Sequence, residues 1–114
     1  MAKEVIAVDL GGTNLRVALI RDKKIVKLIR KRTPKTKEGI LEEIFESIAS
    51  LMNKNVKGIG VGTAGPVFNG ILLNPPNLPF RNFNLKSTLK KKFRIRVEIE
   101  NDANCVALAE LKLG

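Results

Sequence analysis

Residues 4–21, with the sequence EVIAVDLGGTNLRVALIR, decide the fold that the rest of the chain follows. Two apolar runs rich in Val and Ile, residues 4–10 and 15–21, lie on either side of the tetrapeptide Gly-Gly-Thr-Asn at residues 11–14. Runs of this composition form strands, and consecutive glycines between them are typical of a tight hairpin turn. The stretch therefore predicts two antiparallel strands joined by a turn.

The pattern downstream of this hairpin predicts further strands and helices. Residues 24–32 alternate apolar and basic side chains, which predicts a third antiparallel strand. Thr36 is a suitable helix cap, and after it apolar residues recur at three- and four-residue intervals as far as Met52, which predicts a core-facing helix. The remaining predicted elements are a buried strand at 56–61, a basic helix at 85–93, a strand at 97–99 and a helix at 103–113.

The resulting order βββαβαβα predicts one domain over residues 1–114. Three antiparallel strands followed by right-handed helical crossovers to parallel strands are typical of a three-layer α/β domain. We therefore expect the ribonuclease H-like or actin-like ATPase architecture, with a mixed sheet that begins with three antiparallel strands.

Charge and composition narrow the possible classes of partner. The formal net charge is +10, and the basic residues fall mainly in residues 21–37 and 86–96, interleaved with apolar ones. We interpret them as solvated faces, with attraction of nucleotide, acidic substrate or nucleic acid as the alternative. Stacking of bases needs exposed aromatic side chains, and the chain has five Phe and no Trp or Tyr. A nucleic-acid partner is therefore disfavoured.

The residues that are missing exclude several kinds of chemistry. The chain has no His and one Cys, Cys105, so Ser-His and Cys-His catalysis are excluded and a Cys/His zinc site is disfavoured. The apolar run from Val5 to Val8 is interrupted by Asp9, and it is too short for a signal peptide or a membrane span. We expect a cytoplasmic protein.

The turn at residues 11–14 has the composition of a phosphate-binding loop. Without a Cβ, the backbone at Gly11 and Gly12 can approach a phosphate closely, while Thr13 and Asn14 add hydrogen-bond donors. Asp9, at the end of the strand, is positioned to hold a hydrated Mg²⁺ near those phosphates. A valine at Gly12 is expected to weaken phosphate binding far more than sugar binding. The alternative is a hairpin turn without a ligand.

A second glycine run, residues 60–65, fits the spacing G-x-G-x-x-G of dinucleotide-binding folds. That motif needs a helix at its end and an acidic residue about 20 positions later. Here Pro66 and Val67 follow the glycines, and the region near residues 80–86 supplies no acid. No P-loop motif is present either, so neither kind of nucleotide site is predicted.

The segment Glu-Asn-Asp-Ala-Asn at residues 100–104 follows a predicted strand and precedes a predicted helix. One interpretation is that Asn101 or Asp102 caps the helix. The other is that the Asp102 carboxylate, kept ionised at a helix N-terminus, accepts a proton from a substrate hydroxyl that Asn101 orients. These residues alone leave both interpretations open.

Together these segments resemble the ROK family of sugar kinases and related repressors. Residues 9–14 are similar to the family's first phosphate motif, and residues 62–67 to its sugar-side loop. Residues 74–80 resemble its asparagine-leucine-proline-aromatic stretch, and residues 100–104 its catalytic segment. The resemblance covers nearly the whole chain.

The resemblance implies ATP and Mg²⁺ as cofactors. It places Gly11, Gly12 and Thr13 on the ATP phosphates, beside the donor of Asn14, and Asp9 on the magnesium ion.

It also implies a sugar site. Gly65, Asn77 and Asn101 would contact sugar hydroxyls, and Asp102 would be the catalytic base. These four positions come from three separate segments of the chain.

The chain is thus interpreted as the N-terminal lobe of a glucokinase-like enzyme that transfers the γ-phosphoryl group of ATP to a hexose or amino-sugar hydroxyl. The family's second lobe, with its adenine pocket and zinc motif, would lie outside residues 1–114. We therefore expect this chain to be inactive alone, and to be completed by a C-terminal lobe, a partner subunit or a homo-oligomer. The alternatives are a truncated sugar-binding or regulatory relative and, more remotely, an RNase H-like nuclease.

Overall fold

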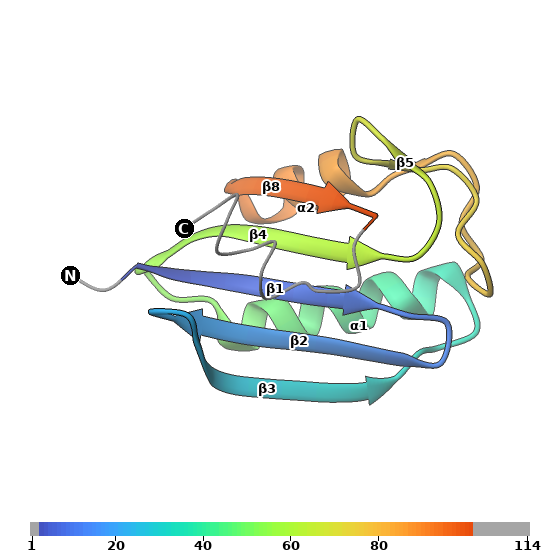
Figure 1. The fold of residues 1–114 in the computed structure, drawn as a ribbon. Helices are drawn as coiled ribbons and strands as arrows, with labels where there is room; N and C mark the ends of the chain where they lie inside the picture. Colours follow the sequence, from blue (N-terminus) through green and yellow to red (C-terminus); the bar gives the residue numbers. More distant parts are fainter. Residues whose placement is uncertain (1–2, 102–114) are drawn as a thin grey trace.

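The computed structural model describes residues 3–101, which form two β-sheets and two helices (Figure 1). The larger sheet has five strands in the order β3-β2-β1-β4-β8. β1 pairs antiparallel with β2, and β2 with β3, whereas β1 and β4, and then β4 and β8, pair in parallel. The expected mixed sheet is therefore confirmed. Its strands are β1 Glu4–Leu10, β2 Asn14–Arg21, β3 Lys24–Arg32, β4 Val56–Thr63 and β8 Arg96–Glu100.

Both helices begin at residues whose side chains cap them. α1 spans Lys37–Leu51, and the Gly39 amide donates to Oγ1 of Thr36 at 3.0 Å, so the predicted cap is confirmed. α2 spans Leu85–Phe93, and the Ser87 amide donates to Oδ1 of Asn84 at 2.9 Å. Such caps satisfy amides that lack a partner within the first helical turn. Neither helix is long and apolar enough to cross a membrane.

Both helices pack on the same face of the large sheet. Neighbouring side chains on a strand point to opposite faces, so Val8 and Val17 lie toward the helices, whereas Ala7 and Ala18 lie on the other face. The helix-facing core is almost entirely aliphatic. Its fully buried members include Ile6, Ile40, Ile44, Ile48, Ile59, Leu72, Leu85 and Leu89. Ile20 is also fully buried, but it lies on the other face of the sheet.

The described residues form two layers rather than the expected three. In Figure 1 the α1 helix lies behind the sheet, and α2 joins the same hydrophobic cluster. A smaller cluster occupies the opposite face: Val5, Ala7, Ala18 and Ile20. The helix predicted at residues 103–113 lies outside the described residues, so the third layer stays a prediction.

The segment between β4 and α2 contains a second sheet that was not predicted. Its three strands follow the order β5-β6-β7, with the bounds Val67–Phe68, Ile71–Leu72 and Phe83–Asn84. Asn69 has φ of 51° and Gly70 has φ of 82°, which suits a two-residue hairpin turn. Strands of two residues carry no periodic pattern, and no strand was predicted between residues 61 and 85. The Asn-Gly pair was the available signal.

The parallel strands bring their carboxyl ends to one edge of the sheet. β1, β4 and β8 all point toward the β1–β2 turn in Figure 1. In register, Asp9 lies opposite Gly62, and Gly62 lies opposite Glu100. The segments that follow these strands are therefore neighbours in space.

A buried carboxylate lies near the other end of the sheet. Glu4 is 1% exposed, and it accepts hydrogen bonds from Arg21 Nε at 2.6 Å and from Asn53 Nδ2 at 2.7 Å. These two hydrogen bonds, Asn53 first, hold the pKa of Glu4 below its ordinary value. A carboxyl group with a lowered pKa stabilises the fold above its unfolded-state pKa, and this stabilisation is lost as the pH falls through the folded-state value.

We expect Glu4→Gln to melt at a lower temperature than the wild-type chain near neutral pH, because the Arg21 guanidinium loses its charged partner. The difference should shrink as the pH falls through the lowered pKa of Glu4, where the wild-type carboxylate becomes protonated. Thermal unfolding of both proteins across this pH range measures it. Glu98→Gln is the control, since Glu98 is paired with Lys86 only at 3.5 Å. Equal pH dependence of Glu4→Gln and wild type would contradict the assignment.

Candidate functional site

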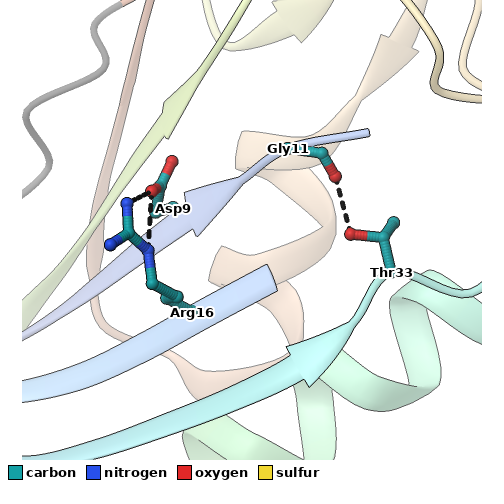
Figure 2. A network of polar contacts seen from close by, with 4 residues as sticks. All are labelled: Asp9, Gly11, Arg16 and Thr33. Atoms are coloured by element: carbon teal, nitrogen blue, oxygen red, sulfur yellow. Dashed lines mark hydrogen bonds and ion pairs between the residues drawn. The ribbon is translucent and has the colours of Figure 1, made fainter. Parts of the chain in front are cut away.

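The turn between β1 and β2 is held in shape by a residue that sequence reasoning missed. Thr33, which directly follows β3 and is 8% exposed, donates from its amide to the Thr13 carbonyl at 2.9 Å. Its hydroxyl donates to the Gly11 carbonyl at 2.7 Å (Figure 2). Within the turn, the Gly11 amide donates to the Asn14 carbonyl at 3.1 Å. No local sequence pattern pointed to Thr33, because its place beside the turn depends on the register in which Arg32 pairs with Asn14.

Thr33→Val keeps the backbone hydrogen bond to Thr13 and removes the hydroxyl that donates to the Gly11 carbonyl. We expect the free energy of unfolding to fall by about 1 kcal/mol, the usual worth of one such bond. Thr33→Ser, which keeps the hydroxyl, is the matched control and should lie closer to wild type. Urea unfolding of the three proteins measures the difference, and a Val variant as stable as wild type would show that the hydroxyl does not hold the turn.

The two glycines of the turn are required by space rather than by backbone angle. Neither Gly11 nor Gly12 has a positive φ. A Cβ on Gly11 would lie 3.0 Å from the Asn14 carbonyl oxygen, and one on Gly12 would lie 2.7 Å from the Cβ of Asn77. Gly12 therefore packs directly against Asn77, so the predicted phosphate turn is in contact with the loop at residues 74–80, which carries this predicted sugar ligand.

The loop that carries Asn77 is itself packed against the segment after β4. Gly65 has φ of 91°, and a Cβ there would lie 2.8 Å from both Pro75 Cα and Pro76 Cδ. Asn77 is also in the left-handed region, with φ of 59°, and its side chain is exposed. Leu78, at 9% exposure, anchors the loop in the core. The structure thus brings Gly65, Asn77 and the glycine turn together.

Asp9 lies at the same edge but already has a charged partner. Arg16, opposite Asp9 on β2, donates from Nε to Asp9 Oδ2 at 3.0 Å and makes a second contact to this oxygen from Nη2 (Figure 2). Arg16 in turn lies opposite Arg30 on β3. A hollow of about 300 Å³ is lined by Asp9, Gly11, Asn14, Arg16 and Arg30.

This arrangement limits how Asp9 could hold magnesium. Both Arg16 contacts use Oδ2, so a water molecule bound to Mg²⁺ could donate to Oδ1 without breaking the ion pair. Within residues 3–101, no three acidic, His or Cys side chains gather into a metal site. The residues therefore fit a largely hydrated ion held through water, which is the usual state of Mg²⁺ beside phosphates.

The predicted catalytic segment is only partly described. Asn101 is exposed and directly follows β8, so it lies at the edge that also carries Asp9 and Gly62. Asp102, the predicted base, lies outside the described residues. The place of Asp102 in the site therefore stays a prediction from the sequence.

Comparison with known proteins agrees with the segments just described. The sequence profile described as "ROK family" matches residues 5–114. A glucokinase of Aeropyrum pernix is 34% identical over 117 residues, covering 97% of this chain and 36% of that protein. A beta-glucoside kinase of Listeria monocytogenes is 34% identical over 116 residues, covering 97% and 39%.

A solved structure has the same fold over nearly the whole chain. The crystal structure of a ROK family glucokinase from Streptomyces griseus in complex with glucose and AMPPNP gives a TM-score of 0.81 at 31% identity, covering 97% of this chain and 37% of that one. The chain thus spans between 36% and 39% of the length of these three relatives.

Proposed function

The chain belongs to the ROK family, and from this premise we propose that it is the N-terminal lobe of an ATP-dependent sugar kinase. The observation that supports this most is the packing of Gly12 against Asn77, where a Cβ on Gly12 would come within 2.7 Å of the Asn77 Cβ. Phosphoryl transfer depends mainly on holding donor and acceptor in line. A phosphate turn in contact with a polar loop supplies one wall of such a site.

We propose that the complete domain has the three-layer, ribonuclease H-like or actin-like ATPase fold. The mixed sheet, its two helices on one face and the TM-score of 0.81 to the Streptomyces griseus glucokinase support this. The third layer would cover the face that carries Ala7 and Ala18.

The donor side of the site would be the turn. The Gly11 amide already donates to the Asn14 carbonyl, so the role of Gly11 would be to leave space for a phosphate, because it has no side chain. The exposed Gly12 and Thr13 would present their amides to the ATP phosphates. Asn14, exposed at the start of β2, would add a side-chain donor. Magnesium, when bound, neutralises charge on the β- and γ-phosphates, and Asp9 would hold it through water.

The acceptor side would be a hexose or amino sugar. Asn77 and Asn101 have exposed amides that could hydrogen-bond sugar hydroxyls, and Gly65 would let the sugar approach the backbone. Asp102 would accept the proton of the attacking hydroxyl. The Streptomyces griseus relative was solved with glucose, so glucose is the first substrate to test.

We propose that residues 1–114 need an opposing lobe for turnover. Phosphoryl transfer requires a shielded electrostatic site, and the described residues supply one wall of it. The opposing wall would come from a C-terminal lobe, a partner subunit or a second copy of the chain. An enzyme that uses ATP and sugar phosphates would act in the cytoplasm.

Titration of the isotopically labelled chain, followed by NMR, tests this function. Glucose should shift the amide signals of Gly65 and Asn77, whereas Mg-ATP should shift those of Gly12 and Thr13. A response to sugar without any response to Mg-ATP would instead favour the non-catalytic sugar-binding relative. The absence of both responses, with the chain folded, would contradict the proposal.

A further inference from the structure

The outer edge of the large sheet is formed by β3. In the part of the chain that the structure describes, β3 pairs only with β2, so its other side lies at the sheet edge (Figure 1). Every residue of β3 except Ile29 is exposed. On an edge strand, every second residue directs its N–H and C=O groups away from the sheet, where another strand can pair with them. β3 therefore offers backbone groups to a further strand.

Three of the large apolar side chains that are exposed among the described residues lie on this strand. Ile25 is 50% exposed, Val26 42% and Leu28 49%. Val26 is the extra residue of a β-bulge, because the paired residues on its two sides, Ile25 and Lys27, oppose adjacent residues of β2. Beyond the bulge the register is regular to the end of β3. Residues 27–32 therefore form a regular edge that a further strand could extend.

This edge is also strongly cationic. β3 carries five basic residues and no acidic one: Lys24, Lys27, Arg30, Lys31 and Arg32. Within residues 3–101, none of the five is in an ion pair. Like charges that lie directly opposite each other destabilise paired strands, so these residues disfavour pairing between two copies of β3. The same charges attract a strand that carries carboxylates.

The charged and apolar side chains of residues 27–32 are arranged in the same way on both faces of the sheet. The helix-side face carries Lys27, Ile29 and Lys31, and the other face carries Leu28, Arg30 and Arg32. Each face thus has one aliphatic and two cationic side chains. An antiparallel strand that matches them has three acidic, two aliphatic and one acidic side chain in order from its N-terminus.

We propose that β3 is a docking edge for an extended segment of a partner protein with this acidic and aliphatic composition, which adds to the sheet beside β3. Main-chain hydrogen bonds hold the segment, its aliphatic side chains cover Leu28 and Ile29, and its carboxylates pair with the surrounding cations. An anionic membrane would match the charges but not the backbone groups of the edge, so a protein segment fits better. This docking edge does not depend on the proposed kinase function.

The test is NMR titration of the isotopically labelled chain, in about 0.15 M salt, with the end-blocked hexapeptide Glu-Glu-Glu-Val-Val-Glu. The peptide should shift the amide signals of residues 27–32 and slow hydrogen exchange of the amides that face outward, because the added strand protects them. The double variant Lys27→Glu/Lys31→Glu should raise the peptide Kd by at least about tenfold, since like charges would then face each other.

The double variant Lys90→Glu/Lys91→Glu is the matched control. It makes the same change of charge at exposed positions of α2, away from β3. Because charges outside the contact are screened by salt, this variant should change the peptide Kd by less than about threefold. An equal loss in both double variants would show that the peptide responds only to net charge, and it would refute the docking edge.

Two methylated peptides separate strand addition from charge attraction. They carry methyl groups on odd or on even backbone amides and keep every side chain. One of the two should bind at least about tenfold more weakly, because its methyl groups face β3 and block the hydrogen bonds. Unchanged binding of both, or no shift at residues 27–32, would refute the proposal. So would dimerisation of the chain through β3, or binding of anionic vesicles without binding of the peptide. Circular-dichroism melting confirms that each variant is folded.

Discussion

Asp102→Asn, introduced into the complete kinase, is expected to lower kcat by about 10²- to 10⁴-fold while the sugar Kd stays nearly unchanged. Asparagine keeps the size of the side chain, its ability to cap a helix and one hydrogen bond to the sugar hydroxyl. It cannot accept the proton that this hydroxyl must lose. The effect should therefore appear in the chemical step and not in ground-state binding.

Asn101→Ala is the comparison variant for this prediction. Loss of a contact that orients the sugar should raise the sugar Kd as well as slow the reaction. Single-turnover phosphorylation alongside equilibrium sugar binding separates the two patterns. If Asp102→Asn keeps near wild-type turnover, the carboxylate is only a helix cap, and the base lies elsewhere.

Gly12→Val should disrupt nucleotide and sugar binding together. The sequence alone predicted a selective loss of phosphate binding, whereas the structure leads us to expect both losses, because a Cβ on Gly12 would come within 2.7 Å of the Asn77 Cβ. Either the turn or the loop that carries Asn77 must move. Overpacking of this kind typically costs about 1–3 kcal/mol, and a strain of that size relieved only in the unbound state would lower affinity by about 5- to 150-fold.

A second-site variant makes this prediction sharper. Asn77→Gly removes the clashing Cβ, and glycine suits the φ of 59° at this position. Gly12→Ala combined with Asn77→Gly should therefore recover most of the Mg-ATP affinity that Gly12→Ala loses, while sugar affinity stays low for want of the Asn77 amide. Calorimetric titration of the single and double variants measures this. No recovery of Mg-ATP binding in the double variant would show that the contact does not set the shape of the turn.

The sheet and the long helix could be predicted because their signals are local. β1, β3 and α1 follow from apolar periodicity and from the cap at Thr36, and both helices of the described region begin within one residue of the predicted position. β4 and β8 run to Thr63 and Glu100, past the predicted ends, because pairing with a central neighbour extends a strand beyond its apolar run.

The site was predicted as a set of segments but not as an arrangement. The contact between Gly12 and Asn77 joins residues far apart in sequence, and no local pattern encodes it. Arg30 was interpreted as part of a solvated basic segment, because alternation predicts the face of a strand and not which side chains of the neighbouring strand lie beside it. Thr33 was missed because its role depends on the register between β2 and β3.

The most direct test of the central claim is phosphoryl transfer by a chimera. Residues 1–114 would replace the matching segment of the Aeropyrum pernix glucokinase, which is 34% identical to this chain. Transfer of ³²P from γ-labelled ATP to glucose is measured, with the Asp102→Asn chimera as the control. The account predicts glucose phosphorylation that this substitution lowers by at least about 10²-fold. A folded chimera that binds glucose and Mg-ATP but transfers no phosphate, or one that Asp102→Asn leaves fully active, would contradict it.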